Sequence, residues 1–171
     1  MTDEFQLAVG RTALVLIVVG SLAVIVVGAR RVGVATGIVA GLTWFVGSAC
    51  AFLASAHLVG VIWTAAYVNT YFGWTFRFAS LLLVGFWLIL AGVLCVVAAS
   101  EVFRGRSPDW RRAASGALLL ALVAGPLVPV QPELAGGVVT LAVTDLVAIT
   151  GFRVGGWALS RRERKPAPID T

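Results

Sequence analysis

Residues 12–31 have the sequence TALVLIVVGSLAVIVVGARR, an uncharged apolar run that ends in two arginines. A helix that crosses the hydrocarbon core of a bilayer needs about 20 mainly apolar residues. A helix is the expected conformation because lipid offers no hydrogen-bond partners to an exposed backbone. Basic residues beside a span tend to remain on the cytoplasmic side. This stretch therefore predicts a transmembrane helix and the direction in which it crosses.

The composition of the whole chain also favours a membrane protein. Of its 171 residues, 60% are hydrophobic and 12% are charged, against about 45–50% and about 25% in typical globular chains. The mean hydropathy is +0.99. So few charges leave a soluble domain without a polar coat, which excludes a secreted disulfide scaffold and a disordered regulator. The net charge of +5 comes from short basic clusters between apolar runs. The sequence has no continuous basic stripe of the kind that binds nucleic acid, so we do not expect nucleic acid as a partner.

Five apolar segments are long enough to cross the bilayer as helices. The predicted fold is an all-α, five-transmembrane-helix bundle that forms a single domain over residues 1–160. The basic tail over residues 161–171 contains two prolines, and we expect it to be disordered in the cytoplasm. The predicted spans cover residues 12–28, 33–56, 78–99, 113–130 and 134–159.

The basic residues are distributed unevenly among the connections between these spans. Two follow the first span, four follow the third and four follow the fifth, whereas the other connections carry few. The positive-inside rule then places the N-terminus outside and the C-terminus inside. The ten residues are Arg30, Arg31, Arg104, Arg106, Arg111, Arg112, Arg161, Arg162, Arg164 and Lys165.

The segment 57–76 is apolar enough to be a sixth span. A sixth span would put two of the basic clusters on opposite sides of the membrane, which the positive-inside rule disfavours. We therefore predict an outer interfacial or re-entrant helix at about 57–76. Its aromatic residues recur at helical spacing, and aromatic rings are common at the headgroup layer. The residues assigned to this outer interface are His57, Trp63, Tyr67, Tyr71, Trp74 and Arg77.

Small residues form stripes along the predicted spans. Such stripes let helix backbones approach closely, and van der Waals contact is a main source of helix association in lipid. They serve either packing within the chain or docking of a partner, and the stripe on the second span is our candidate partner face. That stripe consists of Gly33, Gly37 and Gly41, and a further stripe on the fifth span consists of Gly137, Thr144 and Gly151.

One acidic residue, Asp145, lies near the middle of the fifth span, where an acid costs about 2.5–3.5 kcal/mol on the insertion scale. Helical rise places it at the depth of hydroxyl and indole donors on other spans. It is either an acid that handles protons or ions, or a protonated carboxyl in a hydrogen-bonded structural clasp. The predicted intramembrane polar layer comprises Asp145, Thr144, Ser48, Trp44 and Trp87.

The sequence suggests no catalytic chemistry of its own. One histidine and two cysteines do not supply a set of metal ligands, and we expect no metal, no cofactor and no catalytic residue. The predicted function is an accessory, scaffold or assembly subunit that docks another membrane protein, or a second copy, within the bilayer. The alternative is a small transporter or proton-coupled carrier that uses Asp145. The preference for Arg over Lys, with abundant Ala, Gly and Val, favours a prokaryotic cytoplasmic membrane.

Overall fold

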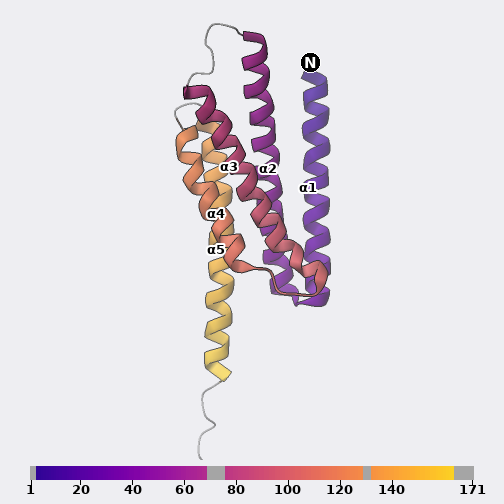
Figure 1. The fold of residues 1–171 in the computed structure, drawn as a ribbon. Helices are drawn as coiled ribbons and strands as arrows, with labels where there is room; N and C mark the ends of the chain where they lie inside the picture. The colour runs from indigo at the N-terminus through magenta and orange to yellow at the C-terminus, as the bar shows by residue number, and fades with distance from the viewer. Residues whose placement is uncertain (1–2, 69–75, 129–131, 164–171) are drawn as a thin grey trace, which may run out of the picture.

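The computed structural model describes residues 3–68, 76–128 and 132–163, and every regular element in these ranges is helical. Five α-helices and two short 3-10 helices follow one another along this part of the chain (Figure 1). In order, they are α1 (Asp3–Arg31), α2 (Val34–Val68), α3 (Phe76–Ser100), η1 (Glu101–Arg104), α4 (Trp110–Ala124), η2 (Gly125–Leu127) and α5 (Pro132–Glu163).

The α-helices form one bundle in which consecutive helices run in opposite directions (Figure 1). The central element is α2, which packs against α1, α3 and α5. The turn from α1 to α2 contains only Val32 and Gly33. Gly33 has a φ of 109°, a value that glycine adopts far more readily than any residue with a Cβ.

Four helices in the described part of the chain contain segments long and apolar enough to cross a membrane. The predicted span over residues 113–130 is not one of them, because α4 has only 15 residues. That length is about 22 Å at helical rise, whereas the hydrocarbon core is about 30 Å thick. The α-helix ends early because Pro126 has no N–H for an α-helical hydrogen bond, and the chain continues into η2. The candidate spans are Leu7–Arg31, Val34–Ile62, Leu81–Arg104 and Pro132–Gly156.

The helix α2 is longer than predicted, and it runs without a break to Val68. The prediction of a separate interfacial or re-entrant helix is therefore wrong for residues 57–68. This segment contains no proline to stop the helix, and continuing the helix keeps its backbone groups bonded internally. At 35 residues, α2 is about 52 Å long. Residues 69–75, which make up most of the remainder of the predicted element, lie outside the described residues.

The helix α5 also extends further than the predicted span. It continues to Glu163, so the first residues of the predicted tail are helical. Its last turns project beyond the end of the other helices (Figure 1). Residues 164–171 lie outside the described residues.

Glycines bring α2, α3 and α4 close together. A Cβ added to Gly47 of α2 would lie 2.6 Å from the carbonyl oxygen of Gly92 of α3. A Cβ added to Gly116 of α4 would lie 2.7 Å from the sulfur of Cys95 of α3. Real side chains do not fit at these distances, so the glycines set the spacing of the three helices. The core between them and α5 contains Val46, Cys50, Ala54, Leu88, Ala91, Cys95, Leu120, Ala124, Ala135, Val138 and Ala142.

The first two basic clusters lie at the same end of the bundle. Arg31, the last residue of α1, donates a hydrogen bond from Nη1 to the carbonyl oxygen of Phe103 in η1. Val102 of η1 packs with Val24 of α1 and Ala40 of α2. These contacts place the connection after α1 and the connection after α3 at the same end of the bundle.

Candidate functional site

The most buried acidic group in the described residues is Asp145, near the middle of α5. It shares a face of α5 with Ala142 and Ile149, which pack in apolar clusters with residues of α2, α3 and α4. Thr43 of α2 is also 0% exposed. Its hydroxyl Oγ1 donates to Asp145 Oδ1 at 2.7 Å. This hydrogen bond joins α2 to α5 inside the bundle.

The second oxygen of this carboxyl group, Oδ2, is buried and has no hydrogen-bond partner among the residues that the structure describes. Cys50 and Cys95 are free and buried in the neighbouring apolar core. A buried polar atom without a partner costs free energy in apolar surroundings. Asp145 is therefore the group in the interior whose chemistry most needs an explanation.

The partner of Asp145 is a residue that the sequence analysis missed. Thr43 precedes the predicted Trp44 by one position, so the predicted depth on α2 differs from the observed one by a single residue. The predicted Thr144, next to Asp145 in sequence, is exposed. It differs from Asp145 because neighbouring residues on a helix point about 100° apart. Its hydroxyl donates to the carbonyl oxygen of Thr140, one turn earlier, at 2.8 Å. From the sequence, Thr43 could have been found only by working out which residues of α2 lie on the helix face that contacts α5.

The other members of the predicted polar layer lie elsewhere. Trp44 packs edge-on against Phe103 of η1, with ring centroids 6.3 Å apart, and its indole lies over Gly20 of α1. Trp87 is 40% exposed on the surface of α3. Ser48 is half-buried on α2, and no hydrogen bond to Asp145 is found for it in the described chain. The structure thus brings Asp145 together with Thr43 and with none of its predicted partners.

The predicted partner face on α2 is used for packing within the chain. Gly37 lies against the backbone of α1 at Ala29, and Gly41 lies against Ile25 of the same helix. Gly33 belongs to the turn that joins α1 to α2. Close helix approach therefore does occur at this stripe, but its partner is α1.

A stripe of small residues on α5 remains uncovered. At each of its four glycines, apart from the adjacent residues and the local backbone of α5, no heavy atom in the described part of the molecule lies within 4 Å of the place a Cβ would take. Two exposed threonines lie between them, and each hydroxyl donates to a carbonyl of α5 at 2.8 Å. These six positions fall within about 100° of the helix circumference. We call them the open face of α5: Gly136, Gly137, Thr140, Thr144, Gly151 and Gly155.

The residues predicted for an outer interface do not form a described site. His57 is buried, and its ring lies beside Gly85 of α3, so it belongs to the contact between α2 and α3. Arg77 lies in α3, and Trp63 and Tyr67 lie in α2; the side chains of these three are outside the described part of the structure. Tyr71 and Trp74 lie outside the described residues altogether.

Comparison with known proteins assigns no family to this chain. It matches no known protein family, no curated protein and no solved structure. Its function is therefore inferred from the arrangement of its own residues.

Proposed function

We propose that the protein is a multi-pass membrane subunit without a catalytic site of its own, which docks a transmembrane helix of another membrane protein. The open face of α5 is the proposed docking surface. The observation that supports this proposal is the open space at all four glycines of that face. Small residues let two helices approach until their backbones are in van der Waals contact, which is a main source of association in lipid.

The contrast between α5 and α1 supports this choice of surface. The exposed side of α1 carries large aliphatic residues such as Leu14, Val15 and Leu16, which are suited to contact with lipid chains. The open face of α5 consists mainly of glycines and threonines, with two large exposed residues, Val147 and Val154, in the same arc. The threonine hydroxyls are already bonded within α5, so they need no partner on a second helix. The glycines leave room for the backbone of such a helix to approach.

The test compares substitutions at glycines that are equally open. Gly137→Leu together with Gly151→Leu fills the open face, and Gly60→Leu fills an open position on α2. The full chain is extracted from its native membrane in mild detergent and analysed by blue-native electrophoresis and pull-down. We expect the wild type and Gly60→Leu to migrate with the same partner, and the double variant to lose it.

Two outcomes would contradict the proposal. Either the wild-type chain migrates as a monomer and recovers no membrane protein, or the double variant and Gly60→Leu retain the partner equally. If the purified chain forms the larger particle alone and the double variant does not, the occupant is a second copy of this chain. Gly37 is unsuitable for this test because it packs against α1.

We also propose that the end of the bundle carrying Arg31 and Arg104 faces the cytoplasm of a prokaryotic cell, with the N-terminus outside. The support is the positive-inside rule, the contact between α1 and η1, and the direction of α5, which runs back to this end of the bundle after the shorter α4 (Figure 1). Protease digestion of N- and C-terminal tags in right-side-out vesicles tests it. Cleavage of the C-terminal tag from outside would refute the orientation.

A second candidate function is a small proton-coupled carrier that uses Asp145. The observation in its favour is the buried Oδ2 atom, which has no partner among the described residues. The complete burial of Asp145 favours a structural clasp instead, because a carrier site must reach water from each side in turn. Asp145→Asn tests the carrier: unchanged pH-dependent flux in vesicles, with folding intact, would remove Asp145 from a coupling role.

A further inference from the structure

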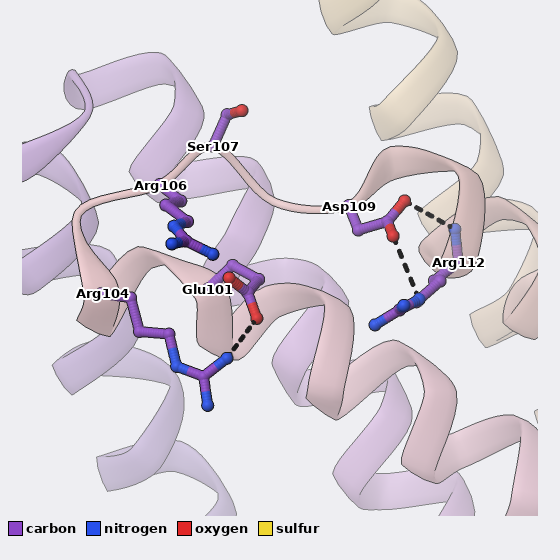
Figure 2. Close-up of a pocket in the computed structure, with 6 residues that line it drawn as sticks. All are labelled: Glu101, Arg104, Arg106, Ser107, Asp109 and Arg112. Atoms are coloured by element: carbon purple, nitrogen blue, oxygen red, sulfur yellow. Dashed lines mark hydrogen bonds and ion pairs between the residues drawn. The ribbon is translucent and has the colours of Figure 1, made fainter.

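We infer that a pocket in the connection between α3 and α4 holds the phosphate of an anionic phospholipid headgroup. The pocket has a volume of about 640 Å³. Ligand pockets typically measure about 300–1,000 Å³, so its size suits a headgroup. The lining residues, shown in Figure 2, are Glu101, Arg104, Arg106, Ser107, Asp109 and Arg112.

The backbone around this pocket is held in a defined conformation. Gly105 follows η1 with a φ of 71°, and its N–H donates to the carbonyl oxygen of Val102 at 3.1 Å. The N–H of Arg106 donates to the carbonyl oxygen of Glu101, also at 3.1 Å. This pair of bonds is the Schellman arrangement that ends many helices. Beyond it, Asp109 caps α4 by accepting from the N–H of Arg112. The arginines therefore project from an ordered turn.

The pocket has an excess of positive charge. Arg104 pairs with Glu101 at 2.9 Å, and Arg112 pairs with Asp109 at 3.1 Å. Arg106 makes no ion pair within the described ranges, and Figure 2 shows its side chain pointing back toward Glu101. Each guanidinium has five N–H donors, so Arg104 and Arg112 retain donors after pairing. The lining therefore has one more arginine than it has acids, and guanidinium groups bind phosphate well.

The position of the pocket favours a lipid over a free anion. The candidate spans of α1 and α3 end at Arg31 and Arg104, which places the pocket where headgroups lie. Val97 and Val93 are exposed on α3, about one and two turns before Glu101 respectively. Because positions four apart lie on one helix face, they form an apolar track from the span to the pocket. Basic pockets at the ends of transmembrane helices are known binding sites for anionic headgroups.

The experiment measures binding to the full chain by native mass spectrometry in a non-ionic detergent. The probes are dioctanoyl phosphatidylglycerol, dioctanoyl phosphatidylcholine and inorganic phosphate. We expect saturable binding of one phosphatidylglycerol, at least tenfold weaker binding of phosphatidylcholine, and no competition by inorganic phosphate at equal concentration. Arg106→Gln should weaken phosphatidylglycerol binding by about tenfold, the effect of losing one charge-assisted hydrogen bond.

The matched control is Arg111→Gln, an exposed arginine beside the pocket that does not line it. It should change the affinity less than about twofold, since a rim charge is screened by solvent. Size-exclusion profiles of both variants check that they fold. Equal weakening by the two variants would overturn the inference in favour of general attraction to a basic surface. Competition by inorganic phosphate as strong as that of the lipid would overturn the lipid as the source of the phosphate.

Discussion

Replacing Thr43 by valine should destabilise the bundle through a single hydrogen bond. Valine has nearly the same shape as threonine but no donor, so Asp145 Oδ1 would lose the bond that it accepts at 2.7 Å. Oδ2 has no partner among the described residues, so both oxygens would then be unpaired in the interior. Leaving a buried group unsatisfied costs about 1–3 kcal/mol, and interhelical bonds in membranes average about 0.6 and reach about 1.7 kcal/mol. We expect a loss of about 1–2 kcal/mol, or about 5- to 30-fold in the folding equilibrium.

The assay is equilibrium unfolding in mixed micelles at increasing dodecyl sulfate fraction, followed by tryptophan fluorescence. The matched control is Thr144→Val, which removes an exposed hydroxyl bonded within α5 and should change stability by less than about 0.5 kcal/mol. A double-mutant cycle of Thr43→Val with Asp145→Ala should give a coupling of about 1 kcal/mol. Equal losses for the two threonine variants, or zero coupling in the cycle, would refute the reasoning.

Three further predictions concern glycines and thiols. Gly47→Ala should lower the free energy of unfolding by about 1–3 kcal/mol in the same assay, because its Cβ would lie 2.6 Å from a carbonyl oxygen of α3. Gly60→Ala, the control, has open space around the new Cβ and should not destabilise the protein. Gly105→Ala should cost about 1–2 kcal/mol because a φ of 71° strains a residue with a Cβ; an unchanged midpoint would contradict this. Cys50 and Cys95 are buried, so a water-soluble maleimide should label them only after unfolding, and rapid labelling of the native protein would disprove their burial.

The helical class and most span positions could be predicted from the sequence because they depend on composition alone. An apolar run in lipid has one economical backbone conformation, so helices were expected at the runs near 12–28, 33–56, 78–99 and 134–159. The ends were less predictable. A continuous α2 from residue 57 to Val68 makes as many backbone hydrogen bonds as a separate helix there would make. Pro126 ends α4 before it reaches the length of a span.

The partners of the buried groups could not be predicted because they depend on how each helix is rotated. Helical rise placed Asp145 at the depth of Trp44, one residue from the true partner, Thr43. One residue corresponds to about 100° around the helix, and that angle separates an interior hydroxyl from an indole packed on η1. The hydrophobic pattern specifies this rotation weakly, since nearly all positions on the spans are apolar.

The small-residue stripes show the same division. The sequence alone determined that several helices can approach closely, because glycine spacing is a local property of each helix. Only the tertiary structure decided which stripes are used: Gly37 and Gly41 pack against α1, while Gly137 and Gly151 remain open. The physical reason is that lipid-facing and protein-facing surfaces are both apolar in a membrane protein, so hydrophobicity cannot tell them apart. Backbone fit between particular helices makes that choice, and it exists only once the bundle has formed.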